Sequence, residues 1–357
     1  MKKKYAYIIT LLLLICTGSG IFCGCVSKEE PDVISEMEKD MRGASADEKS
    51  RETIQNDDDY IVVGFSQVGS ESDWRNASTD SFRTMFSSEN GYYLLYEDAQ
   101  QKQENQLKDV RNFILQEVDY IILDPIVETG WDTVLMEAKD AGIPVILVDR
   151  KVKVEDEDLY TCWVGSDFEK EGRRAGEWLE NYLKIQGREK EKIQIVTLQG
   201  TPQSSSQIGR TEGFREILGR NKNWDMLERR NGEFTQAKGK EVMEDFLDLY
   251  KNIDVVVSEN DNMTFGAIEA IEAAGRSYGP EGDIIIISFD AVRAALEFMQ
   301  KGRINVDFEC NPILGPIVSD LIQRLERGEK VDKVRYIEEQ YFDAAMNIRE
   351  ILKNRIY

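Results

Sequence analysis

The residues of this chain whose types suit chemistry lie in two polar stretches, 66–75 (SQVGSESDWR) and 99–105 (AQQKQEN). The first follows a short apolar run that ends at Phe65, and it supplies hydroxyls, an amide, a carboxylate, an indole and a guanidinium. Such groups can match the hydroxyls of a small polyhydroxylated molecule, while the indole gives a flat face for a sugar ring. Neither stretch pairs a nucleophile with a base, so the pattern indicates that the ligand is bound rather than transformed.

Composition excludes several other kinds of chemistry. The chain has 357 residues and no histidine, so it lacks the commonest general base and the commonest metal ligand. We therefore exclude Ser-His-Asp and Cys-His enzymes and a His-ligated zinc site, and we expect neither a metal nor a cofactor. The 45 Lys and Arg residues against 67 Asp and Glu give a net charge of −22, which argues against nucleic acid because its phosphates need a basic face.

From Tyr60 onward the hydrophobic pattern alternates between strands and helices. Most of the apolar runs are rich in Val, Ile and Leu without a period of two, as in a parallel sheet covered on both faces. Amphipathic segments lie between these runs, and Gly142 and Gly275 end two of them. The predicted strands are 61–65, 92–96, 120–123, 145–148, 193–198, 226–229, 255–258, 284–289 and 304–308, and the predicted helices include 103–116, 133–141, 169–183, 236–250 and 262–274.

The strand–helix pattern occurs twice, near 60–160 and near 165–290, which predicts two similar α/β lobes with doubly wound parallel sheets. Ligands of such sheets bind beyond the carboxyl ends of the strands, so two facing lobes can form opposing jaws. A single Asp after a strand is more often a helix cap, but polar groups at so many strand ends favour a ligand site. The polar residues that follow predicted strands are Ser66, Gln67, Asp98, Asp124, Asp149, Arg150, Gln199, Glu259, Asn260 and Asp290.

The N-terminus is typical of an export signal. Three lysines precede an apolar run at 5–15 that is too short to span a bilayer comfortably, and the string FCGC resembles the lipobox of bacterial lipoproteins, with Cys25 as the lipidated residue. An ordinary signal peptide with incidental cysteines, or a short membrane anchor, is the alternative. We interpret 1–25 as a lipoprotein signal peptide and 26–59 as an acidic flexible tether, which predicts a lipid-anchored protein on the outer face of the cytoplasmic membrane.

Several of these stretches resemble the periplasmic sugar-binding proteins of ribose/galactose type, and in particular the galactofuranose-binding proteins of bacterial ABC transporters. The strings SQVGSES-x-WR and QQKQEN are specific to that branch, whereas the polar strand ends are shared more widely. The resemblance covers nearly all of 60–357. It implies two lobes joined by three hinge crossings: an N-terminal lobe of 60–163 and 311–336, and a C-terminal lobe of 164–310 and 337–357.

The resemblance also implies roles for the polar residues. Trp74 would stack on the sugar ring, since its place between Asp73 and Arg75 argues against full burial; a core tryptophan is the alternative. The arginines would donate to sugar oxygens and the Asp and Asn residues would pair with hydroxyls, with salt bridges and helix caps as the alternatives. At the second hinge, either Glu309 or Asn311 would face the cleft. The expected ligand-binding residues are Ser66, Gln67, Trp74, Arg75, Asp98, Asp149, Arg150, Arg210, Asn260, Asp290, Glu309 and Asn311.

Two features leave alternatives open. Asp73 stands where the galactofuranose branch usually has a small residue, and a carboxylate beside the indole could change which hydroxyls are read. Cys162 and Cys310 both fall near predicted hinge crossings, and an exported location permits a disulfide between them. Two buried thiols are the alternative.

The function implied by the resemblance is that of a monomeric binding protein, not an enzyme. It would capture a monosaccharide, either galactofuranose-like or another pentose or hexose, and deliver it to the permease of an ABC transporter. A sensor that presents its closed form to a membrane histidine kinase is the alternative. A sugar repressor of the same fold is rejected because 1–59 offers no basic helix-turn-helix. A glycosidase with paired carboxylates, such as Asp98 and Asp149, is the enzymatic rival.

Overall fold

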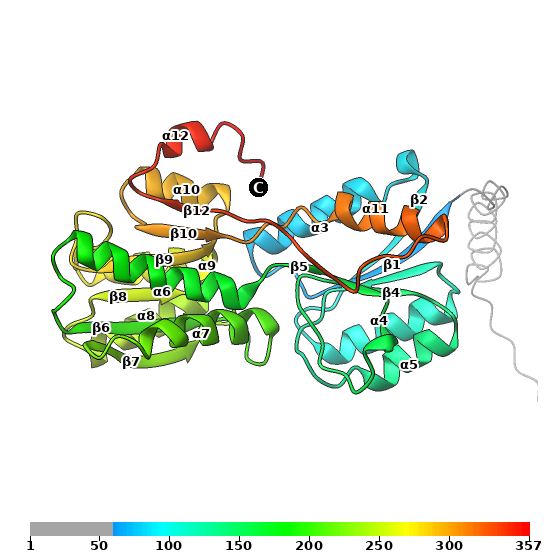
Figure 1. Cartoon of the computed structure of the whole chain (residues 1–357), viewed down its shortest axis with the longest axis horizontal. Coiled ribbons are helices and arrows are strands. Elements are labelled where there is room, and N and C mark those ends of the chain that lie inside the picture. The colour runs from blue at the N-terminus through cyan, green and yellow to red at the C-terminus, as the bar shows by residue number, and fades with distance from the viewer. Residues whose placement is uncertain (1–59) are drawn as a thin grey trace, which may run out of the picture. The chain divides into compact units, whose positions relative to one another are not determined.

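The computed structural model describes residues 60–357, which form two six-stranded sheets covered by helices (Figure 1). The predicted signal peptide, lipobox and tether lie outside the described residues. Among the helices within 60–357, none has the length and apolar character needed to cross a membrane.

The first sheet is parallel throughout. Alternate residues of its strands enter two separate cores, one shared with α3 (Asp73–Met85) and α11 (Gly315–Glu326) and the other with α4 (Gln103–Leu115) and α5 (Asp132–Asp140). Burial on both faces explains why the strands show no apolar–polar alternation. The strand order is β11 (Val334–Tyr336), β5 (Cys162–Gly165), β4 (Val145–Val148), β3 (Tyr120–Leu123), β1 (Ile61–Gln67) and β2 (Tyr92–Asp98).

The second sheet repeats this plan with one antiparallel edge strand. Its two cores are shared with α6 (Phe168–Ile185) and α7 (Ser205–Leu218) on one face, and with α8 (Gln236–Leu249), α9 (Asp261–Ala273), α10 (Arg293–Gln300) and α12 (Ile348–Ile351) on the other. The strand order is β12 (Tyr341–Asp343), β10 (Val306–Glu309), β9 (Ile285–Asp290), β8 (Val255–Ser258), β6 (Ile193–Gln199) and β7 (Trp224–Asn231), and β12 is antiparallel to β10.

The predicted α/β class with two similar lobes is confirmed. Every predicted strand and helix is present, with ends displaced by a few residues. The sequence analysis missed β5, β11 and β12, of which β11 and β12 are three-residue edge strands with a weak signal.

The chain passes between the two sheets after β5, after β10 and after β11. We call these passages the first crossing (166–167), the second crossing (310–314) and the third crossing (337–340). We call the part built on the first sheet the N-terminal lobe and the part built on the second sheet the C-terminal lobe. Figure 1 shows the crossings as the segments of chain that join the two lobes.

Helices α6 and α7 of the C-terminal lobe pack backbone against backbone. A Cβ atom at Gly172 would overlap the backbone carbonyl of Arg210, and one at Gly213 would overlap the carbonyl of Glu169. Gly176 and Gly209 face the other helix at similarly close range. This close approach fixes where α7 lies, and therefore where the side chain of Arg210 begins.

Replacing Gly172 by alanine should lower the free energy of unfolding by about 1–3 kcal/mol, because a methyl group would force the two helices apart. Denaturant unfolding followed by circular dichroism measures this change. Gly219→Ala is the matched control: φ there is −63°, and in the described part of the chain its Cβ would meet no atom nearer than 3.5 Å. An equal loss in both variants would contradict the close packing.

Candidate functional site

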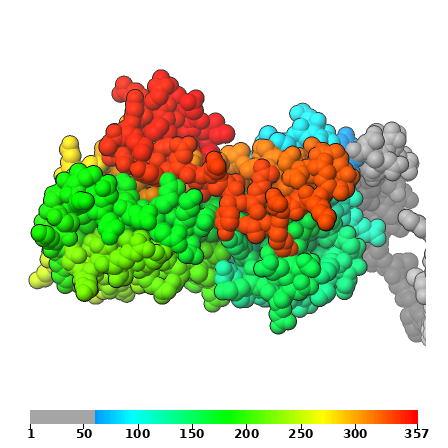
Figure 2. Space-filling model, in the orientation of Figure 1, coloured from blue at the N-terminus to red at the C-terminus, as the bar shows by residue number. Residues whose placement is uncertain are grey.

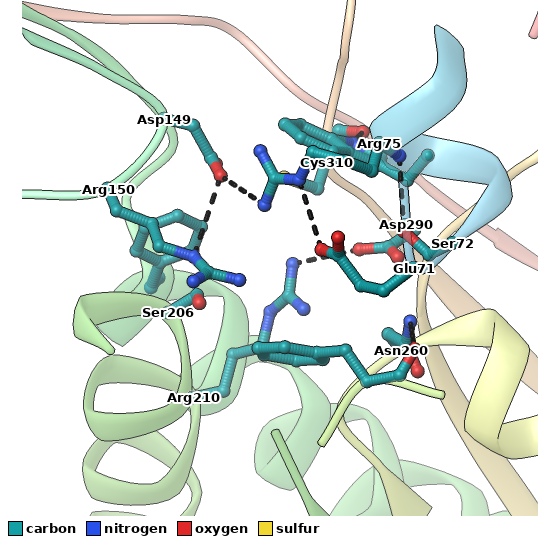
Figure 3. Close-up of a pocket in the computed structure, with 13 residues that line it drawn as sticks. Glu71, Ser72, Arg75, Asp149, Arg150, Ser206, Arg210, Asn260, Asp290 and Cys310 are labelled. Atoms are coloured by element: carbon teal, nitrogen blue, oxygen red, sulfur yellow. Dashed lines mark hydrogen bonds and ion pairs between the residues drawn. The ribbon is translucent and has the colours of Figure 1, made fainter. Parts of the chain in front are cut away.

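A cavity lies between the lobes, where the carboxyl ends of both sheets face each other (Figure 3). Loops and helix starts that follow the strands supply its wall, as expected for doubly wound sheets. The residues that line it are Glu71, Ser72, Trp74, Arg75, Asp149 and Arg150 from the N-terminal lobe, Phe168, Ser206, Arg210, Phe234, Asn260 and Asp290 from the C-terminal lobe, and Cys310 from the second crossing.

The two lobes touch each other around the cavity. The backbone amide of Asp73 donates to Oδ1 of Asn262 at 3.0 Å, and the backbone amide of Lys151 donates to Oγ of Ser205 at 2.8 Å. The space-filling view shows the lobes in contact along their boundary on the face drawn (Figure 2). The structure is therefore the closed arrangement of the two jaws.

Three buried guanidinium groups converge on the cavity, and each lies over an aromatic ring (Figure 3). A ring face attracts a cation through its quadrupole and excludes water from it. The pairs, with the distance from guanidinium carbon to ring centroid, are Arg75 with Trp74 (4.7 Å), Arg150 with Phe234 (5.3 Å) and Arg210 with Phe168 (5.4 Å).

Arg75 is neutralised by carboxylates from three elements of the N-terminal lobe. Its Nε donates to Glu71 at 3.1 Å, its Nη2 donates to Asp149 at 3.2 Å, and its Nη1 forms a short contact with Asp124. Burial alone would lower the pKa of Arg75, but the three carboxylates outweigh burial and raise it. Burial raises the pKa of Asp124 to about 8, although Arg75 opposes that shift. The cluster therefore holds Arg75 charged and immobile.

Arg210 is held in the same way in the C-terminal lobe. Its Nε donates to Glu171 at 2.7 Å, its Nη2 donates to Asp290 at 3.1 Å, and its Nη1 contacts the backbone carbonyl of Glu259. Burial disfavours the charge of Arg210, but Glu171 and then Asp290 raise its pKa well above the ordinary value. Arg150 is held more loosely, with its Nε 3.9 Å from Asp149, and burial, followed by Arg75, lowers its pKa.

The charged groups of the cavity wall balance in number, with three arginines against Glu71, Asp149 and Asp290. Such a wall suits a neutral polar ligand better than an ion, because an ion would leave a buried charge uncompensated. Within residues 60–357, two buried polar atoms of the wall lack a hydrogen-bond partner: Nε of Arg150, a donor, and Oε2 of Glu71, an acceptor. Hydroxyl groups can accept from the first and donate to the second.

Three residues of the wall adopt left-handed backbone conformations that side chains disfavour. φ is +56° at Asp149, +59° at Phe234 and +103° at Asp290. Each such residue costs of the order of 1–3 kcal/mol and persists where the surroundings enforce it, commonly at functional sites. Three of the residues that line the cavity therefore carry backbone strain, although other loops among residues 60–357 contain such residues as well.

Most of the predicted site residues line the cavity, namely Trp74, Arg75, Asp149, Arg150, Arg210, Asn260 and Asp290. One detail of the prediction for Trp74 was wrong, because the side chain is buried, with the residue 4% exposed. Its Nε1 donates to the backbone carbonyl of Cys310 at 2.6 Å, so the indole packs against the second crossing while it borders the cavity. The carboxylate at Asp73 is exposed and is not part of the wall, so it is not in place to read hydroxyls.

Ser66 and Gln67 do not line the cavity, because β1 continues through both and buries them. The Oγ of Ser66 donates to Asp109 at 2.7 Å. The Oε1 of Gln67 accepts from Nη1 of Arg75 at 3.3 Å, so Gln67 supports a cavity residue from behind.

Asp98, Glu309 and Asn311 are also absent from the wall. The side chains of Asp98 and Asn311 each accept from a backbone amide two residues onward, at 2.7 and 2.9 Å, so each stabilises a turn; neither caps a helix. The carboxylate of Glu309 turns to the C-terminal segment, where it contacts Arg355 at 2.5 Å and the hydroxyl of Tyr357 at 2.8 Å. Neither residue of the second-hinge pair borders the cavity.

The wall also contains residues that the sequence analysis did not select: Glu71, Ser72, Phe168, Ser206, Phe234 and Cys310. Glu71 and Ser72 lie inside the first polar stretch, so their neighbours could have pointed to them. Phe168 and Phe234 follow β5 and β7, where only polar residues had been considered. Cys162 and Cys310 are free and buried, so the two-thiol alternative is correct and the disulfide is not formed.

Comparisons with known proteins agree with this architecture. A family model described as the periplasmic binding protein domain matches residues 63–325. The galactofuranose-binding protein YtfQ of Escherichia coli is 40% identical over 303 residues, which make up 83% of this chain and 93% of that protein.

Two solved structures are similarly close. A Mycobacterium smegmatis protein in complex with β-D-fucofuranose is 42% identical with a TM-score of 0.78, over 83% of this chain and 95% of that chain. The periplasmic binding component of the arabinose ABC transporter of Shewanella sp. ANA-3, bound to α- and β-L-arabinofuranose, is 41% identical with a TM-score of 0.77 over the same shares. The family resemblance inferred from the motifs is thus confirmed, and the chain belongs to the periplasmic binding protein family.

Proposed function

We propose that this protein captures a galactofuranose-like monosaccharide between its two lobes and delivers it to the permease of an ABC transporter. The observation that carries the proposal is a donor and an acceptor without a hydrogen-bond partner among residues 60–357, Nε of Arg150 and Oε2 of Glu71, in a charge-balanced wall backed by aromatic rings. A sugar offers hydroxyls for the polar atoms and C–H faces for the rings. The names of the three relatives, which mention galactofuranose, fucofuranose and arabinofuranose, support a furanose.

Capture follows from the way both lobes contribute to the wall. A ligand that contacts Arg75 and Arg150 in one lobe and Arg210 and Asn260 in the other interacts fully only when the lobes are closed. It therefore shifts the equilibrium toward the closed form by its differential affinity for that form. Micromolar binding needs about −8 kcal/mol, which a few charge-assisted hydrogen bonds of about 1.5–3 kcal/mol each can supply.

Transport rather than sensing is the role we assign to the closed form. The relative from Shewanella is described as part of an arabinose ABC transporter, and it matches this chain at 41% identity. Tethering by a lipid on Cys25 would keep the protein beside a permease in the same membrane.

Isothermal titration of residues 28–357 with galactose, arabinose, ribose, xylose, glucose and fructose should show micromolar binding of at least one sugar that populates a furanose form. Galactose and arabinose are expected to bind best. Charged ligands such as sugar phosphates should not bind, because the wall has no net charge to offer them. Tight binding of a phosphorylated sugar would contradict the proposal. A failure of all six sugars to bind would contradict it as well.

Replacing Arg150 by lysine should weaken sugar binding about 10- to 100-fold, because lysine keeps the charge and loses the Nε donor and the planar, forked guanidinium group. Titration calorimetry measures the change, and thermal unfolding checks that the fold is kept. Arg111→Lys is the matched control, since Arg111 is an arginine whose side chain is 46% exposed and pairs with Glu137. Equal sugar affinities of the two variants would show that Arg150 does not contact the sugar.

Expression of the full chain in a bacterium fed with labelled palmitate should give a membrane-bound, labelled protein. Cys25→Ser should abolish both the label and membrane retention, whereas Cys23→Ser should leave them intact, because only the cysteine after Gly24 fits the lipobox. Labelling that survives Cys25→Ser would refute the anchor.

A further inference from the structure

Glu339 of the third crossing ties the three hinge segments together. Its Oε1 accepts a hydrogen bond from the Oγ of Ser166 in the first crossing at 2.6 Å. The same oxygen accepts from the backbone amide of Asn311 in the second crossing at 2.8 Å. Its backbone carbonyl accepts from Nη1 of Arg174 on α6 at 3.2 Å. One carboxyl group thus joins every passage between the lobes.

Glu171 at the start of α6 faces this carboxyl group. Its Oε2 accepts from Nε of Arg210, whereas its Oε1 is buried and has no hydrogen-bond partner among residues 60–357. Oxygens of Glu171 and Glu339 and the sulfur of Cys310 lie within 4.8 Å of one another. Two carboxylates this close repel each other unless a proton or a cation lies between them.

Among residues 60–357, Arg210 is the cation that forms a salt bridge with Glu171, and the carboxylate of Glu339 has no salt-bridge partner, although Lys170 and Arg174 line the same cavity. Arg210 is committed to Glu171, Asp290 and the carbonyl of Glu259. The charged and titratable groups that face the pair are Arg210 on α7, Lys170 and Arg174 on α6, Asp167 in the first crossing, Asp149 after β4, Asp290 at the end of β9 and the Cys310 thiol. Burial raises the pKa of that thiol, so it remains uncharged.

Water can reach the pair from a second cavity at the hinge. This cavity, of about 150 Å³, is lined by Asp167, Lys170, Glu171, Arg174, Tyr336, Ile337 and Glu339. Glu171 therefore borders the second cavity while it binds Arg210, which lines the ligand cavity. In the space-filling view the chain after α11 runs over the surface near the lobe boundary (Figure 2). A proton on the pair can thus exchange with solvent without passing the ligand.

We propose that Glu171 and Glu339 share one proton in the closed form, and that this proton holds the hinge closed and makes sugar capture depend on pH. The proposal rests on the proposed function for its link to sugar. Glu339 is then a positioning residue: it acts on the ligand through Glu171, which orients the guanidinium of Arg210.

The direction of the pH effect follows from the pKa of the Glu339 carboxyl group in the closed form. Burial, and then the neighbouring Glu171, raises the pKa of Glu339 to about 9. When the crossings separate and water enters, the pKa returns toward the ordinary value of a glutamate. Closing therefore takes up a proton, and rising pH favours the open form between the ordinary pKa and about 9. Above that value the dependence disappears.

Titration calorimetry with L-arabinose, in buffers of different ionisation enthalpy, measures both affinity and proton uptake. We expect the affinity of the wild type to fall between about pH 6 and about pH 8, by at most about tenfold per pH unit for one proton. Glu339→Gln should remove this dependence and keep the low-pH affinity. Its amide oxygen can still accept from Ser166 and Asn311, and its NH₂ group replaces the shared proton.

Glu338→Gln is the matched control, because Glu338 is the exposed neighbour in the same crossing. It should keep the pH dependence of the wild type. Arabinose binding without proton uptake, or an unchanged slope in Glu339→Gln, would overturn the proposal while leaving the sugar-binding function intact.

A second readout does not need sugar. The measurement is NMR of protein labelled with ¹³C at the glutamate δ-carbons. The resonance of Glu339 is assigned as the one that disappears in Glu339→Gln, and its chemical shift should be that of a protonated carboxyl group at neutral pH. An ordinary acidic titration of that carbon overturns the shared proton whether or not any sugar binds. A stoichiometric metal ion in the purified protein, lost in Glu339→Gln, would overturn it too, because a cation would then take the place of the proton.

Discussion

Charge buried between two lobes has to be neutralised by nearby side chains, and this requirement organises the whole site. Arg75 alone gathers carboxylates from the loop after β1, from the end of β3 and from the end of β4. Removing one partner of such a cluster leaves a buried charge uncompensated, which is far more costly than the net gain from the pair. The clusters therefore hold the donors and acceptors of the wall in a single arrangement, rather than adding much stability to the fold.

The same requirement connects the cavity with the hinge. Arg210 needs Glu171, Glu171 lies within 4.8 Å of Glu339, and Glu339 bonds to the other two crossings. The backbone contact between α6 and α7 keeps Arg210 and Glu171 at bonding distance, since glycines allow these helices to touch. A change in the state of the hinge carboxyls therefore reaches a ligand-facing guanidinium through two buried contacts.

The fold could be predicted because strands buried on both faces leave long apolar runs, and helices leave amphipathic ones. The parts that were missed carry weak signals: β11 and β12 are three-residue edge strands. For the site, the rule that ligands bind at carboxyl ends of strands selected Asp149, Arg150 and Asp290, which line the cavity between the lobes. It could not show that β1 extends through Gln67 and buries Ser66. A rule based on polar residues also misses Phe168 and Phe234, whose rings back the arginines.

The polar groups of the cavity wall differ in whether they already have partners within the protein, and this difference bears on how the protein can both hold and release its ligand. In the described wall most charged atoms already have partners within the protein, so an empty closed cavity would not be strongly penalised by bare charges. The unpaired Nε of Arg150 and Oε2 of Glu71 are the exceptions, and both belong to the N-terminal lobe. A sugar could meet these two groups before the lobes close, and then gain contacts with Arg210 and Asn260 on closure. Because only those later contacts favour the closed form, a modest change at the hinge is enough to reopen the cleft.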